Sequence, residues 1–312
     1  MVKVKNIFKE QNVGFGEKSL YQGDRLLNSN GEFNVKRRGM PLLKRIDIFY
    51  FMVGISWSYF YLIIFALFFL INFSFGIIYM SIGIEHLTGL VHKSFWENAW
   101  ECFFFSAQTF TSVGYGRVAP TGFWISLIAS FEAMIGLMSF AVATGLLYGR
   151  FSRPRAKLMF SDNIILSPYK EDTALMFRFI NKKQNTLTDA EVRVTLSMED
   201  KTVNPPIRRF YNLEPEFKKI NFLSLNWTVV HHINDQSPLF QMKMADLQES
   251  KAEFIISIQA FDSTFSQVIQ ARHSYTWTQL KEGYKFARMY FPSENGSGTI
   301  MEIDKLSDIE KV

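Results

Sequence analysis

The segment FTSVGYGRV, from Phe110 to Val118, places two glycines around one tyrosine within the most apolar third of the chain. Glycine adopts positive φ without steric cost, so Gly114 and Gly116 would let successive carbonyl groups point to the same side. A row of carbonyl oxygens can replace the hydration shell of a potassium ion. We therefore predict a selectivity filter that binds K⁺ at Ser112, Val113, Gly114 and Tyr115 and is completed by Gly116.

The elements on either side of this segment have the length of membrane helices. No charged residue occurs from Ile48 to Ile84, and one straight helix over about 37 residues would be about 55 Å long, against about 30 Å of hydrocarbon. Because small residues surround Trp57, we expect an interfacial slide helix over 46–56 and an outer transmembrane helix over 57–83. One long tilted helix is the alternative. A second apolar segment, 121–151, is expected to form the inner transmembrane helix.

The stretch between the two spans, 94–118, is too apolar for an exposed loop and too short to cross the membrane and return. We expect a pore helix of about four turns that enters the membrane, followed by a return path that contains the filter. Irregular backbone at membrane depth must be buried in protein or line a wet cavity, because lipid cannot satisfy its amide groups. One chain supplies only one wall of such a cavity, so we predict a ring of chains.

Basic residues flank both spans on the same side, whereas the intervening loop is nearly balanced in charge. By the positive-inside rule, the N-terminal segment 1–45 and the C-terminal part of the chain are both expected to be cytoplasmic. The basic residues at headgroup depth serve topology and are also candidates for binding anionic membrane lipids. These candidates are Lys44, Arg45, Arg150, Arg153, Arg155 and Lys157.

After Pro154, short segments of alternating apolar and polar residues, such as AEVRVTLSM and EFIISIQAFD, replace the long apolar runs. Such segments with turn residues between them predict a β-sandwich over 152–312. The sequence shows no nucleotide-binding loop, catalytic triad spacing or metal-ligand cluster, so we expect no enzyme, no organic cofactor and no nucleic-acid partner. The neighbours His231 and His232 would face opposite sides of a strand, one packed and one solvated.

The motif SVGYG, between two membrane helices, resembles the potassium-channel signature TVGYG, with Ser112 in place of threonine. The segments RLLNSNGEFNV, DIFYFMVGISW, RFSRPRAK and ARHSYTWTQL are similar, in the same order, to segments of inward-rectifier potassium channels, in particular of their prokaryotic, KirBac-type branch. The resemblance implies an α+β membrane protein of a bacterial inner membrane. It would have two transmembrane helices, a re-entrant pore helix with a filter loop, a cytoplasmic immunoglobulin-like β-sandwich and a homotetrameric assembly, with K⁺ as the permeant ion.

The resemblance also implies roles along the inner helix. It places a hinge at Gly136 and the gate at Phe140 and Tyr148, whose rings from several chains would close a narrow pore. Phe140 stands where strongly rectifying members carry an aspartate, so strong rectification through this position is not expected. For Glu132 two alternatives remain: a carboxylate near the pore cavity that concentrates cations, or a carboxyl group hydrogen-bonded behind the filter.

Two other function classes remain compatible with the sequence. Ser112 changes the innermost ion site, so a non-selective cation channel is one alternative. The other is a membrane-tethered β-sandwich that binds a ligand without conducting ions. Replacement of Gly114 by alanine would distinguish this binding module from a channel, because a channel should stop conducting whereas a binding module should be unaffected.

Overall fold

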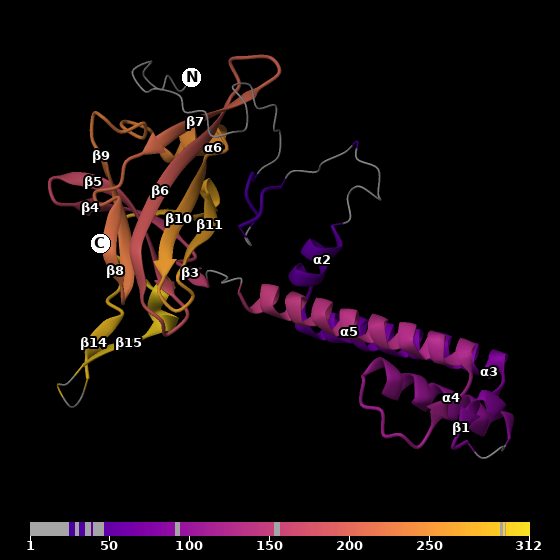
Figure 1. Ribbon diagram of the computed structural model, residues 1–312. Coiled ribbons are helices and arrows are strands. Elements are labelled where there is room, and N and C mark those ends of the chain that lie inside the picture. The colour runs from indigo at the N-terminus through magenta and orange to yellow at the C-terminus, as the bar shows by residue number, and fades with distance from the viewer. Residues whose placement is uncertain are drawn as a thin grey trace. The chain divides into compact units, whose positions relative to one another are not determined.

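The computed structural model describes residues 25–28, 31–34, 39, 47–90, 94–152, 157–293, 296 and 298–312. The chain forms two compact units. One unit is Gly39–Arg153, and the other combines Met1–Arg38 with Pro154–Val312. The first carries the long helices and the second carries most of the β-strands, so the two are described in turn (Figure 1).

The described residues of the helical unit form four α-helices. They are α2 (Ile48–Gly54), α3 (Trp57–Ile82), α4 (Phe95–Phe110) and α5 (Phe123–Phe151). With 26 and 29 residues, α3 and α5 are about 39 and 44 Å long, and their apolar sequences are long enough to cross about 30 Å of hydrocarbon. A short 3₁₀ helix η1 (Ile84–His86) and a paired ribbon of β1 (Leu87–Thr88) and β2 (Ala119–Pro120) complete the unit.

The chain breaks between α2 and α3, so the single tilted helix is not formed. Ile55 and Ser56 have extended backbone, with ψ of 164° and 158°. The Ser56 side chain accepts a hydrogen bond from the Tyr59 amide at 3.5 Å, and Asp47 accepts one from the Tyr50 amide at 2.9 Å. Each helix therefore has its own N-cap, which satisfies amide groups that a helix end leaves without intrahelical partners.

The helices α3 and α5 run antiparallel and side by side, and α4 packs against both (Figure 1). Trp57, at the start of α3, contacts Phe151, at the end of α5, with ring centroids 5.1 Å apart. A buried apolar cluster joins α4 to its neighbours: Tyr79, Leu87, Cys102, Phe105, Val118, Ile125 and Ala129. The pore helix is thus fixed against both long helices, and so is the start of the segment that follows it.

The C-terminal part is a β-sandwich of two five-stranded sheets, as the sequence predicted. The first sheet has the order β11-β10-β6-β7, and β8 also pairs with β6; its strands are β11 (Gln267–Thr276), β10 (Glu253–Asp262), β6 (Leu187–Asp200), β7 (Ile207–Leu213) and β8 (Lys219–Leu223). The second has the order β12-β4-β5-β3, and β9 also pairs with β5; its strands are β12 (Leu280–Glu282), β4 (Ile164–Tyr169), β5 (Asp172–Asn181), β3 (Leu158–Phe160) and β9 (Asn226–Ile233). Apolar side chains of both sheets form one core between them.

Smaller elements surround the sandwich. They are α6 (Met244–Glu249), η2 (Trp277–Gln279), β13 (Tyr284–Phe286), β14 (Tyr290–Pro292), β15 (Thr299–Met301), η3 (Ile303–Ser307) and β16 (Ile309–Lys311). The C-terminal segment is held by Arg178, which is buried in β5 and donates to the carbonyl oxygens of Leu306 at 2.6 Å and Ala287 at 2.7 Å. These bonds tie the last strands to the main sheets.

The N-terminal segment packs on the same sandwich. Leu26 and Leu27 are buried, and their backbone amides donate to the carboxylate of Glu253 at 2.7 and 3.1 Å. Gly31 has φ of 81°, and a Cβ there would lie 2.7 Å from the carbonyl oxygen of Arg272. The glycine is therefore required both by its backbone conformation and by the close approach of the N-terminal segment to the strand that carries Arg272.

Candidate functional site

The filter segment leaves the C-terminal end of α4 in an irregular conformation. Positive φ recurs at every second residue, with 59° at Ser112, 52° at Gly114 and 79° at Gly116. A Cβ at Gly114 or Gly116 would meet nothing within 4 Å, so both glycines are needed for their φ values and not for lack of space. This periodic backbone is the feature that a row of aligned carbonyl groups requires.

The sequence did not predict the positive φ of Ser112. A positive φ is uncommon for a residue with a side chain, and it is stabilised here by the end of α4. The Ser112 amide donates to the Thr109 carbonyl at 3.1 Å, and the Val113 amide donates to the Gln108 carbonyl at 3.0 Å. These two bonds turn the chain sharply out of the helix and start the filter.

The filter side chains are largely uncovered within one chain. The exposed fraction is 54% for Val113 and 80% for Tyr115. Irregular backbone at membrane depth needs a cover of protein, because lipid cannot satisfy its amide groups. A single chain leaves the side chains of this segment without such a cover.

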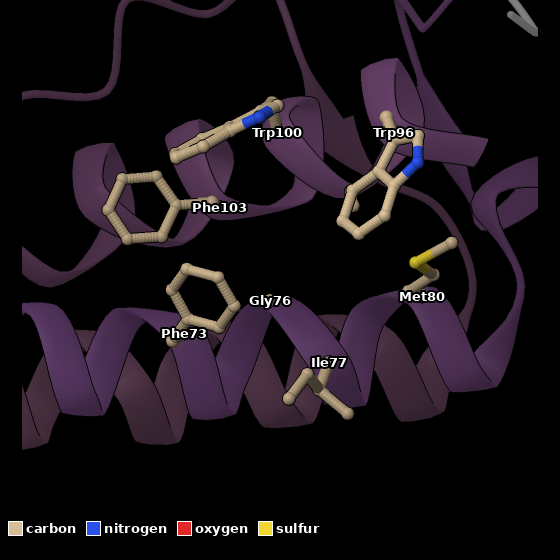
Figure 2. Close-up of a pocket in the computed structure, with 8 residues that line it drawn as sticks. Phe73, Gly76, Ile77, Met80, Trp96, Trp100 and Phe103 are labelled. Atoms are coloured by element: carbon tan, nitrogen blue, oxygen red, sulfur yellow. The ribbon is translucent and has the colours of Figure 1, made fainter. Parts of the chain in front are cut away.

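The pore helix α4 rests closely on the outer helix α3. A Cβ at Gly76 would lie 3.3 Å from the backbone of Phe103, so the glycine permits the approach of the two helices. Beside this contact lies a small apolar pocket, which Figure 2 shows between α3 and α4. Its lining residues are Phe73, Gly76, Ile77, Met80, Trp96, Ala99, Trp100 and Phe103.

Glu132, in the N-terminal half of α5, is completely buried among the three helices. Its carboxyl group is hydrogen-bonded to the hydroxyl groups of Tyr79 on α3 and Ser106 on α4. Ser106 also donates to Asn72 Oδ1 of α3 at 3.0 Å. Of the two alternatives for Glu132, this position agrees with a carboxyl group behind the filter and not with a carboxylate that lines an open cavity.

Gly136 lies one turn below Glu132 and meets the end of the pore helix. A Cβ on Gly136 would lie 1.9 Å from the carbonyl oxygen of Phe110 and 3.0 Å from its Cα. Glycine is therefore required here by close packing of α5 against α4. Whether the residue also acts as a hinge remains a prediction.

The C-terminal half of α5 has a largely exposed face in a single chain. Phe140 and Tyr148, the expected gate residues, each have an exposed fraction of 74%, and Thr144 between them is also exposed. Glu132 and Gly136 pack against α4, whereas Phe140 and Tyr148, further along α5, are exposed. The exposed rings are free to meet other chains.

Arg117, directly after the filter, forms an ion pair with Glu101 on α4. The pair joins the outer end of the filter to the middle of its own pore helix. Both partners are partly exposed, with side-chain exposed fractions of 56% and 21%, so its strength depends on salt. Sequence reasoning did not identify this ion pair.

The guanidinium group of Arg150, one of the lipid-binding candidates, is occupied by contacts within the protein. Nη1 and Nη2 donate to the carbonyl oxygens of Met52 and Ile55 at 2.5 and 2.8 Å, at the end of α2. The same group lies 4.4 Å from the ring centroid of Trp57 and 4.6 Å from that of Phe60. Arg150 therefore connects the end of the inner helix to the slide helix.

Of the other basic candidates for lipid binding, Lys157 is described. The others, Lys44, Arg45, Arg153 and Arg155, lie outside the described residues. Lys157 is exposed, and its carbonyl oxygen accepts a hydrogen bond from the Lys182 amide at 2.8 Å. A joint lipid site of these residues remains a prediction.

The paired histidines of β9 have the arrangement that the sequence predicted. His231 is buried and lies 2.7 Å from the Glu214 carbonyl oxygen and 2.8 Å from the Ser237 hydroxyl, and burial lowers its pKa. The His232 side chain is 24% exposed and lies 3.7 Å from the Asp172 carboxylate. Across the part of the chain that the structure describes, no group of three His, Cys, Asp or Glu side chains could hold a metal ion.

Comparison with known proteins identifies both units. Residues 60–153 match the family model "Ion channel", and residues 158–312 match "Inward rectifier potassium channel C-terminal domain". The chain is 29% identical over 274 residues to the inward rectifier potassium channel Kirbac3.1 of Paramagnetospirillum magnetotacticum, covering 87% of this chain and 91% of the relative.

Similarity extends to animal proteins. The chain is 25% identical to the ATP-sensitive inward rectifier potassium channel 12 of Gallus gallus, covering 90% of this chain and 72% of the relative. It is also 25% identical to the G protein-activated inward rectifier potassium channel 4 of Mus musculus, covering 84% and 67%. With its two membrane-length helices, its filter segment and its matching C-terminal domain, the chain belongs to the inward-rectifier potassium channel family and is of the KirBac type.

Proposed function

We propose that four copies of this chain surround one pore and conduct K⁺ passively through the filter Ser112–Gly116. Membership of the potassium channel family and the integral membrane character of the chain support this function. The observation that carries the site assignment is the positive φ at alternate filter residues, which suits a row of carbonyl oxygens. The uncovered filter side chains supply the reason for a ring of chains.

The proposed ion path leads from the filter to the lower half of α5. Phe140 and Tyr148 project from an uncovered face of that helix, and rings from four chains would narrow the pore and exclude water from it. We assign the gate to these residues. Phe140 brings no charge for a blocking cation, so rectification through this position is weak.

Gating is proposed to involve the slide helix. Arg150 holds the end of α2 to the last turn of α5, close in sequence to Tyr148. A displacement of α2 would therefore reach the gate through Arg150. Anionic lipids are proposed to act on the neighbouring basic residues, with both termini on the cytoplasmic side of a bacterial inner membrane.

Flux measurements on purified protein in liposomes test the function. The proposal predicts barium-sensitive flux that is selective for K⁺ over Na⁺, and loss of that flux in Gly114→Ala, because alanine is strained at φ of 52°. Gly145→Ala is a matched control, since a Cβ there meets nothing within 4 Å and the backbone is helical. Equal K⁺ and Na⁺ flux, or an unchanged Gly114→Ala variant, would refute the proposal.

A further inference from the structure

A buried polar cluster joins the three helices that hold the filter in place. It consists of Asn72 and Tyr79 on α3, Ser106 on α4 and Glu132 on α5, and all four residues are inaccessible to solvent. The cluster lies in an otherwise apolar junction, where each polar group requires a hydrogen-bonding partner. The protonation state of Glu132 can therefore be deduced from the hydrogen bonds.

The orientation of the Asn72 amide determines which group donates the proton in its hydrogen bond with Ser106. Its amide nitrogen Nδ2 donates to the Phe68 carbonyl oxygen at 2.7 Å, which leaves the oxygen Oδ1 to face Ser106 Oγ at 3.0 Å. An amide oxygen only accepts hydrogen bonds, so Ser106 must donate its hydroxyl proton to Asn72. Ser106 then has only acceptor capacity left for Glu132.

The three contacts of the cluster require three protons. Tyr79 and Ser106 supply one each, to Glu132 Oε2 and to Asn72 respectively, and an ionised carboxylate supplies none. The contact between Glu132 Oε1 and Ser106 Oγ is then left without a proton. We infer that Glu132 is a neutral carboxylic acid in the folded channel and donates its own proton to Ser106.

The charges around the cluster support the same state. In the described helical residues, 47–90 and 94–152, the lysine and arginine residues are Arg117 and Arg150. Arg117 pairs with Glu101, and Arg150 binds backbone carbonyls some 18 residues further along α5, about 27 Å away along the helix axis. An ionised Glu132 would be a buried charge without a counter-ion among these described residues, which is strongly unfavourable.

The neutral acid gives Glu132 a positioning role. It links the inner helix to the pore helix through Ser106 and to the outer helix through Tyr79, one turn above the contact of Gly136 with Phe110. This role rests on the proposed function, since it matters for selectivity only if the filter conducts. Glu132 then adds no negative charge to the pore, and it acts by holding the helix from which the filter starts.

Infrared spectroscopy of the purified channel tests the protonation state independently of conduction. At neutral pH, the wild-type spectrum minus that of Glu132→Gln should contain one carboxylic acid carbonyl band. Tyr79→Phe should shift this band to higher frequency, because it removes the hydrogen bond to Oε2. Absence of the band, or a carboxylate band in its place, would overturn the inference.

Ion selectivity tests the positioning role. Glu132→Leu should lower the K⁺ to Na⁺ permeability ratio several-fold, and Glu132→Gln should restore it, since glutamine can accept from Tyr79 and donate to Ser106. Ser74→Ala is the control, because this serine is exposed and bonds only to the Leu70 carbonyl of its own helix. If glutamine performs no better than leucine while wild-type protein conducts selectively, the positioning role is wrong and the proposed function still stands.

Discussion

Replacement of Gly136 by alanine is expected to separate the inner helix from the pore helix. The new Cβ would lie 1.9 Å from the Phe110 carbonyl oxygen, and real Cβ contacts essentially never fall below 3.0 Å, so one helix must retreat by about 1.1 Å. The opposing atoms are backbone and cannot move as a flexible side chain would. Overpacking of this kind typically costs about 1–3 kcal/mol.

Thermal unfolding of the purified channel measures this cost, with Gly145→Ala as the matched control. Both substitutions gain the same helix propensity, about 1 kcal/mol for alanine over glycine, so the difference between them isolates the contact with Phe110. We expect Gly136→Ala to unfold at lower temperature than Gly145→Ala and to lose selectivity. Equal stability of the two variants would show that Gly136 is not required by packing.

Three further predictions concern the surroundings of the filter and the C-terminal domain. Arg150→Lys keeps the charge but loses the paired bonds to Met52 and Ile55, so it should reduce stability by about 2 kcal/mol in thermal unfolding; wild-type stability would show that charge alone matters. Arg117→Gln should lower the free energy of unfolding by less than about 1 kcal/mol, because the ion pair with Glu101 is exposed. The difference in stability between this variant and wild type should shrink in 1 M salt. Burial lowers the pKa of His273 to about 4, so the unfolded chain takes up this proton first as the pH falls through 6.5. The free energy of unfolding should therefore fall less between pH 6.5 and 4 in His273→Gln than in wild type, by at most about 3 kcal/mol. Identical dependence of this free energy on pH in the two proteins would contradict the prediction.

The large features of the fold followed from the sequence because they depend on periodicity and length. The uncharged run before Ile84, the second run ending at Phe151 and the strand segments within β6 and β10 each carry a continuous signal. Strands β3, β4, β7 and β8 were not predicted. They are short or contain residues atypical of buried strands, such as Pro168 in β4 and the buried Arg208 in β7.

The partners of the site residues could not be predicted, because they depend on contacts between helices distant in sequence. Glu132 was recognised as unusual, but Tyr79 and Ser106 carry no local signal that would connect them to it. Asn72, a single amide in the apolar α3, was a usable signal for a polar partner in the membrane. Arg150 was assigned to lipid from its charge, whereas its bonds to the end of α2 depend on the break at Ile55.

The reversal potential of the purified channel with K⁺ on one side of a planar bilayer and Na⁺ on the other tests the central claim most directly. In the proposed filter, aligned carbonyl oxygens at Ser112–Gly116 would replace the hydration shell of K⁺, so the potential should lie far toward the equilibrium potential for K⁺. A reversal potential near zero, from protein that folds and conducts, would contradict potassium selectivity.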